Sequence, residues 1–93
     1  MNYSKMNKVW APEAWNDYVY WQSQDRKTLK RVNKLIKDIE RNGAEIGIGK
    51  PERLRGELEG LWSRRIDEKN RLVYRIRENN IEIVSCRTHY GDK

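Results

Sequence analysis

A set of polar side chains in the carboxyl-terminal half of the sequence could cleave RNA without a metal ion. The set comprises one carboxylate, several guanidinium groups, one imidazole and one phenol: Glu52, Arg53, Arg55, Arg64, Arg65, Arg71, Arg87, His89 and Tyr90. RNA carries its own nucleophile, the 2′-hydroxyl. An enzyme must therefore supply a base to deprotonate it, cations to hold the pentacoordinate phosphate, and an acid to protonate the departing 5′-oxygen. Glutamate, arginine and histidine match these three requirements.

Arginine suits the second requirement because its planar fork donates two hydrogen bonds to phosphate oxygens and stays charged at any working pH. Each residue also has a simpler interpretation. Glu52 could be an exposed loop carboxylate, His89 a surface residue, and the arginines on alternating strand positions a solvated face. Trp62 has two equally favoured interpretations: it could pack in the core or stack on an RNA base.

The sequence is short and basic. Its 93 residues include 20 lysines and arginines against 14 acidic residues, which gives a formal charge of +6. We expect one domain over residues 1–93 and a polyanionic partner, nucleic acid first and an acidic protein second. With one histidine and one cysteine, we expect no internal disulfide, no metal site and no cofactor. No segment approaches the ~18 apolar residues of a membrane span, which predicts a cytoplasmic protein with no membrane contact.

Two helices are predicted in the amino-terminal half. After a short apolar strand at 8–10, Pro12 suits the first turn of a helix that ends near 23–24. Asp25 is a good N-cap for a second, amphipathic helix that runs to Asn42-Gly43. We expect the helices to form a hairpin and three tryptophans to lie in the core: Trp10, Trp15 and Trp21.

Beyond residue 42 the pattern changes from helices to strands. A glycine-rich loop at 43–51 ends at Glu52, and residues 61–66, 71–77 and 81–90 are rich in β-branched and aromatic side chains. Helices segregated from a run of strands define an α+β fold. We predict an N-terminal helical hairpin packed on one face of a twisted antiparallel β-sheet, with the other face free for a ligand.

The strand register decides which polar residues meet. If Asn79-Asn80 is the turn between the last two strands, His89 lies on the same face as Leu72. An even-length loop before the middle strand would put Arg65 on that face too. Arg71 then points the other way, unless a bulge or an odd-length loop shifts the parity. The sequence leaves the position of Arg71 open.

Several ordered sequence blocks carry a family resemblance that runs from Lys8-Val9-Trp10 to His89-Tyr90. They are Trp15-Asn16-Asp17-Tyr18 with Tyr20-Trp21, Asn33-Lys34-Leu35-Ile36-Lys37-Asp38, Gly49-Lys50-Pro51-Glu52, Gly60-Leu61-Trp62-Ser63-Arg64-Arg65-Ile66, Arg71-Leu72-Val73-Tyr74 and Cys86-Arg87-Thr88-His89-Tyr90. With this spacing the chain closely resembles the YoeB (Txe) toxins of the RelE superfamily. The resemblance implies a RelE-like fold, similar to that of microbial ribonucleases.

The resemblance also implies an activity and a role for each matching residue. Family members are toxins of toxin–antitoxin pairs that cleave messenger RNA in the ribosomal A site. Carried onto this sequence, the family mechanism makes Glu52 the general base, Arg65 and Arg71 the transition-state cations and His89 the acid, with Tyr90 completing the catalytic set. Five further residues are expected to bind RNA: Lys50, Arg55, Trp62, Arg64 and Arg87.

The implied partners are messenger RNA, the ribosome with its ribosomal RNA, and a YefM-like antitoxin. The antitoxin should be acidic and partly disordered before binding, because electrostatics favours such a match to a charge of +6. A homodimer is left open. Two other functions are compatible with the same residues: a basic RNA-binding module without catalysis, and a catalytically silent protein that only binds its acidic partner.

Overall fold

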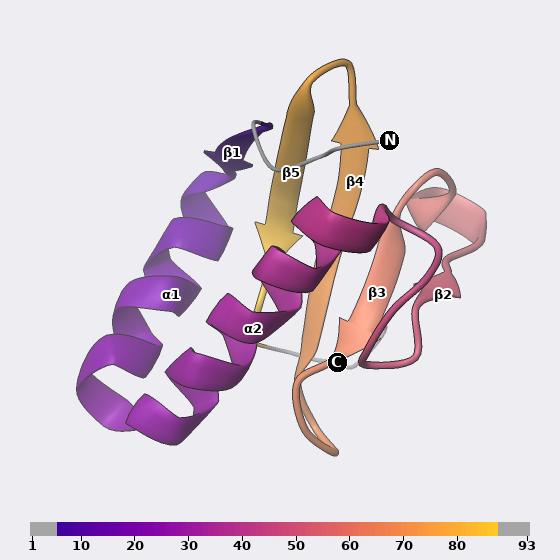
Figure 1. Cartoon of the computed structure of the whole chain (residues 1–93). Helices are drawn as coiled ribbons and strands as arrows, with labels where there is room; N and C mark the ends of the chain where they lie inside the picture. Colours follow the sequence, from indigo (N-terminus) through magenta and orange to yellow (C-terminus); the bar gives the residue numbers. More distant parts are fainter. Residues whose placement is uncertain (1–5, 88–93) are drawn as a thin grey trace.

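The computed structural model of the chain describes residues 6–87, in which two helices pack against one face of a five-stranded sheet (Figure 1). The helices are α1 (Pro12–Gln24) and α2 (Arg26–Asn42), and a short 3₁₀ helix spans Gly56–Leu58. The strands are β1 (Asn7–Trp10), β2 (Glu52–Arg53), β3 (Trp62–Arg65), β4 (Arg71–Arg77) and β5 (Asn80–Ser85). Their order across the sheet is β1-β5-β4-β3-β2. The predicted α+β fold is confirmed.

One strand departs from the predicted antiparallel sheet. The pairs β2–β3, β3–β4 and β4–β5 are antiparallel, whereas β1 lies parallel to β5 at the sheet edge, so the sheet is mixed. The last three strands are joined by short turns, which impose antiparallel pairing. The helical hairpin separates β1 from the other strands, so no short turn sets its direction and the sequence could not specify it.

The helix boundaries agree with the capping signals in the sequence. Pro12 occupies the first turn of α1, and Asp25 separates the two helices. The Asp25 carboxylate accepts a hydrogen bond from the backbone N–H of Thr28 at 3.1 Å, as an N-cap should. Gly43 ends α2 with a φ of 89°, a conformation that glycine adopts without steric cost.

The core lies between the helices and the sheet. The apolar stripe of α2, including Leu35 and Ile39, packs in one cluster with residues of β4 and β5. Trp21 is buried and Trp10 is partly buried against this cluster, as predicted. The prediction for Trp15 is wrong, because 48% of its surface is exposed. Its ring packs instead against Trp10 and Tyr18 at the surface of α1.

The turn between β4 and β5 lies one residue before the predicted position. Arg77 pairs with Asn80, so the two turn residues are Glu78 and Asn79, and Glu78 adopts a positive φ of 58°. The register also shifts between Val73 and Tyr74, which marks a β-bulge or a similar irregularity in this pair of strands. These local features alter which side chains of β4 and β5 lie opposite one another.

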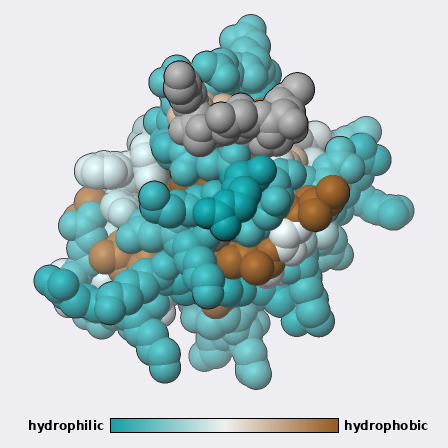
Figure 2. Space-filling view, viewed as in Figure 1, coloured by the Kyte–Doolittle hydropathy of each residue, from teal (hydrophilic) through white to brown (hydrophobic). Residues whose placement is uncertain are grey.

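The face that carries α2 is mostly hydrophilic, with isolated apolar patches (Figure 2). Within residues 6–87, no helix is both long enough and apolar enough to cross a membrane.

Candidate active site

The pairing of β2, β3 and β4 sorts their side chains into two sets. Glu52 lies opposite Ser63, and Arg65 lies opposite Arg71. Directly paired residues share a face, as do residues two apart on one strand. Glu52, Arg65 and Arg71 therefore project from the same face of the sheet, the one that α2 does not cover. The other set faces α2: Trp62, Arg64, Leu72 and Tyr74.

The loop between β3 and β4 determines the position of Arg71. Five residues, 66–70, separate the two strands, so the parity is that of an odd-length loop and Arg71 joins the face of Arg65. Asp67 shapes this loop by accepting hydrogen bonds from the backbone N–H groups of Lys69 and Asn70 at 2.8 and 2.7 Å. The Arg71 guanidinium donates to the backbone carbonyl oxygens of Asp67 and Asn70 at 2.7 and 3.1 Å. One nitrogen of the Arg71 guanidinium is thus bound to the loop.

Arg65 has a fixed backbone and an exposed side chain. Its N–H donates to the carbonyl oxygen of Gly49 at 2.7 Å, and its carbonyl oxygen accepts from Arg31 of α2 at 3.1 Å. Across the part of the chain that the structure describes, the Arg65 guanidinium has no hydrogen bond or ion pair of its own. It is therefore available to an anion on the open face.

Glu52 begins β2 at the edge of the sheet, and its side chain is exposed. Lys50 precedes it, exposed and with a positive φ of 53°, so the chain turns sharply just before the strand. Arg55 is exposed too and precedes the 3₁₀ helix. A carboxylate and several basic groups thus lie on one edge of the molecule.

Arg64 is buried and cannot reach RNA, so the prediction that it binds RNA is corrected. Its side chain is fully buried on the α2 side of the sheet, the reverse of the Arg65 side. It forms an ion pair with Asp38 at 2.5 Å and a hydrogen bond to the Tyr74 hydroxyl at 2.9 Å. Burial without partners would be costly for a guanidinium, so these contacts define it as an internal structural group.

Trp62 lies on the α2 side of the sheet and packs against the core cluster, with the Arg53 guanidinium 5.8 Å from its ring centroid. Of its two interpretations, packing is the one that this position favours, since Glu52 projects from the reverse face. Arg87 lies beyond β5, where its guanidinium sits 3.5 Å from the ring centroid of Tyr20. Its exposed charge is thus held against α1.

His89 and Tyr90 fall outside the described residues, but the chain leading to them is anchored at Cys86. The backbone N–H of Cys86 donates to the Asp17 carboxylate at 2.9 Å, and its carbonyl oxygen accepts from the Trp21 indole at 2.8 Å. Burial raises the pKa of Asp17, although the hydrogen bond from Cys86 opposes this shift. Burial and the Asp17 charge raise the pKa of the Cys86 thiol to about 12, so the sulfur is not a nucleophile at neutral pH.

Two positioning carboxylates were missed from the sequence, Asp17 and Asp38. Each lies on a helix face that the sequence could only describe as polar, because nothing local indicated a buried partner far along the chain. Residues 6–87 contain no group of three histidine, cysteine or acidic side chains that could hold a metal ion.

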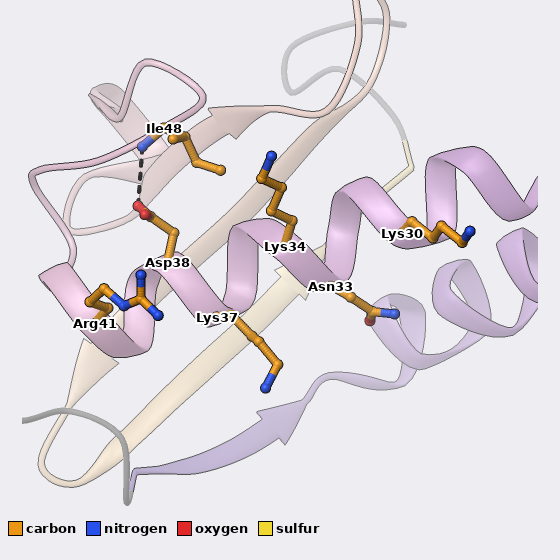
Figure 3. Close-up of a pocket in the computed structure, with 7 residues that line it drawn as sticks. All are labelled: Lys30, Asn33, Lys34, Lys37, Asp38, Arg41 and Ile48. Carbon is orange, nitrogen blue, oxygen red and sulfur yellow. Dashed lines mark hydrogen bonds between the residues drawn. The ribbon is translucent and has the colours of Figure 1, made fainter.

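A basic groove runs along the outer side of α2, away from the open sheet face (Figure 3). It has a volume of about 530 Å³, and its lining is Lys30, Asn33, Lys34, Lys37, Asp38, Arg41 and Ile48. All three lysines of this groove are exposed. The positive charge of the molecule therefore extends well beyond the candidate site.

Two helices covering one face of this sheet, with an open face at the strand edge that carries a carboxylate and arginines, define a RelE-like toxin domain. A model of the "YoeB-like toxin of bacterial type II toxin-antitoxin system" family matches residues 10–90. The chain belongs to this family.

Individual relatives agree with this assignment. Toxin YoeB of Escherichia coli strain K12 is 48% identical over 85 residues, which covers 91% of this chain and 100% of the relative. A YoeB dimer from Staphylococcus aureus superposes with a TM-score of 0.87 at 49% identity, covering 92% of this chain and 99% of that one. A heterotetrameric YoeB–YefM toxin–antitoxin complex from the same organism gives a TM-score of 0.86 at 49% identity, with the same coverage.

Proposed function

We propose that this toxin is an endoribonuclease that cleaves messenger RNA in the ribosomal A site by metal-independent attack of the 2′-hydroxyl. The observation that carries the proposal is the common face of Glu52, Arg65 and Arg71, three side chains from three strands. An open face that presents a carboxylate beside two guanidinium groups fits a ribose-phosphate linkage.

Each group has one role in the proposed reaction. Glu52 removes the proton from the 2′-oxygen, which attacks the adjacent phosphorus. Arg65 and Arg71 stabilise the negative charge of the pentacoordinate phosphate. His89 donates a proton to the departing 5′-oxygen, and Tyr90 positions the substrate. The products are a 2′,3′-cyclic phosphate and a 5′-hydroxyl, so the protein is regenerated after one proton passes from Glu52 back to His89 through solvent.

The ribosome has a physical role in this proposal. Holding the scissile phosphate in line with the 2′-oxygen can contribute up to ~7 to 11 kcal/mol in favourable systems. Exposed basic residues would hold the phosphates on either side: Lys50, Arg55 and Arg87. The reaction needs no metal and no cofactor, and translated messages place it in the cytoplasm.

A YefM-like antitoxin is the proposed protein partner. The relative from Staphylococcus aureus assembles with YefM, and a dimer of that YoeB is also known. An acidic antitoxin segment would be attracted to a chain of charge +6 and would compete with RNA for the same basic face. Single domain organisation over residues 1–93 and a homodimer of this chain are parts of the same proposal.

Primer extension across a message translated in an extract tests the function. The wild-type protein should give discrete cuts that disappear with His89→Ala and Arg65→Ala. Arg26→Ala is the matched control, since Arg26 is an exposed arginine at the start of α2, in the helical layer and not on the sheet face that carries the proposed site. Ribosome binding without cuts would favour the non-catalytic RNA-binding module instead.

A further inference from the structure

Arg64 forms more polar contacts than any other side chain in the described structure, and most of them go to one loop. Its guanidinium donates to the backbone carbonyl oxygens of Gly43, Ile46 and Ile48 at 2.8, 2.9 and 3.2 Å. These carbonyls belong to the segment between α2 and Lys50, residues 43–49, which we call the anchored loop. One buried cation therefore satisfies three backbone carbonyl oxygens of a segment that forms neither helix nor strand.

Asp38 and Tyr74 extend this network to the flanking elements. The Asp38 carboxylate accepts from Arg64 at 2.5 Å. It also accepts from the backbone N–H of Ile48 at 3.1 Å, the bond that Figure 3 shows as a dashed line. Burial alone would raise the pKa of Asp38, but its hydrogen bonds, chiefly that from Arg64, leave the pKa below its ordinary value. The Tyr74 hydroxyl accepts from Arg64 and donates to the carbonyl oxygen of Ala44 at 2.6 Å. The loop is thus bound to α2, β3 and β4 together.

Close packing shows how tightly the anchored loop is seated. A Cβ atom added to Gly49 would lie 2.8 Å from the Leu35 side chain, and Gly49 also has a positive φ of 83°. The carbonyl oxygen of this glycine accepts the backbone N–H of Arg65. The end of the loop is therefore fixed directly to the residue proposed to contact the scissile phosphate.

We propose that Arg64 is a positioning residue for the cleavage reaction: by holding the anchored loop against α2 and β3, it sets where Glu52 stands relative to Arg65. This inference rests on the proposed function of Glu52 as the base. Only Lys50 and Pro51 separate the anchored loop from Glu52. Glu52 begins a two-residue edge strand, so its position depends on the seating of the anchored loop as well as on its pairing with Ser63, whereas Arg65 lies within the four residues of β3.

The test compares a network variant with a core variant of similar size. Tyr74→Phe removes the hydroxyl that links Arg64 to Ala44 and keeps the buried ring, whereas Ile81→Val trims a buried core side chain of β5 that forms no hydrogen bond with Arg64 or the anchored loop. Cleavage of a translated message on programmed ribosomes gives kcat and KM. Backbone hydrogen exchange at Ile48 and Arg65 reports how firmly the loop is held.

Tyr74→Phe should exchange faster at both amides and should lower kcat on the order of tenfold with KM unchanged, because misplacement affects the chemical step and not the exposed ribosome-binding surface. Ile81→Val should match wild type in both measurements. Arg64→Lys keeps the positive charge but should also have a lower kcat than wild type, since one ammonium cannot span the three carbonyl groups that the guanidinium reaches.

A wild-type kcat in Tyr74→Phe, or unchanged exchange at Ile48, would overturn the positioning role and leave the proposed function standing. An equal loss of kcat in Ile81→Val would overturn it too, because general loss of packing would then explain the effect. If wild type itself cut no message, the proposed function would fall, and the positioning role with it.

Discussion

Neighbouring arginines on β3 illustrate how far residue type alone can mislead. Arg64 and Arg65 have the same chemistry, yet one is fully buried under α2 and the other is exposed on the open face. The alternation of a strand guarantees that they separate, but not which one faces in. Asp38 decides this, since a buried guanidinium needs a carboxylate and carbonyl groups around it.

At the same scale, replacing Glu52 tests the base directly. Glu52→Gln keeps the size and polarity of the side chain but removes its capacity to accept a proton. We expect cleavage in a translation extract to fall by about 10²-fold or more, which is typical of losing a general base. Glu57→Gln is the matched control, because Glu57 is an exposed glutamate of the 3₁₀ helix. Full activity of Glu52→Gln would assign the base to another group.

Asp17 offers a residue-level prediction about stability. Its carboxylate is buried and accepts the Cys86 N–H, and its pKa is raised, chiefly by burial. Asp17→Ala leaves that N–H without a partner and should cost about 1 to 3 kcal/mol of unfolding free energy. Asp17→Asn keeps an acceptor and removes the charge, so it should be at least as stable as wild type at pH 7.

The sign of the pH dependence follows from the raised pKa. Between the ordinary value of 3.8 and the raised value, native Asp17 binds more protons than unfolded Asp17, so the stability of wild type falls as pH rises through this range. The advantage of Asp17→Asn should therefore grow with rising pH and vanish below the ordinary value. Chemical denaturation at several pH values measures it. An advantage that grew on acidification would contradict the proposed state of Asp17.

At the scale of elements, the helices were predictable and the sheet register was not. Pro12, Asp25 and Gly43 are local signals, and each works through atoms within four residues of it. The register depends instead on loop lengths and on a positive φ at Glu78, which nothing in the sequence requires. The loop that brings Arg71 beside Arg65 has five residues, but the sequence left open whether its length was odd or even, and so which face Arg71 would share.

The cap between the helices gives a prediction that belongs to this scale. Asp25 ends α1 and caps α2 through both the N–H and the hydroxyl of Thr28. Asp25→Ala should lower the unfolding free energy by about 1 kcal/mol, the usual loss for an N-cap. Thermal melts of the purified chain measure the change, with Asn16→Ala as an exposed control on α1. A loss no larger than that of the control would mean that packing alone holds the hairpin.

For the whole molecule, the sequence predicted the fold class, the family and the charge, but not which basic groups belong together. The open sheet face carries Arg65 and Arg71, while the groove of α2 carries a separate row of lysines. A linear count of +6 cannot separate these surfaces. In the folded chain, Arg65 and Arg71 lie on the sheet face where we propose that cleavage occurs, whereas the lysines lie on the outer side of α2.

Net charge leads to a prediction for the molecule as a whole. Association with programmed ribosomes should weaken steeply with salt, because each phosphate that the toxin neutralises releases condensed counterions. Plotted as log K against log salt, the slope should be more negative than about −3, since each phosphate contributes roughly −0.7 to −0.9. Changing Lys30, Lys34 and Lys37 together to glutamine tests the share carried by the groove.

If the groove contacts RNA, this triple variant should flatten the slope, whereas kcat at saturating ribosomes should stay at its wild-type value because the lysines lie away from the open sheet face. If only the open face contacts RNA, the slope should be unchanged. Titration of labelled toxin onto ribosomes between low and physiological salt distinguishes the two. Binding that is insensitive to salt in wild type would remove the electrostatic basis for a polyanionic partner.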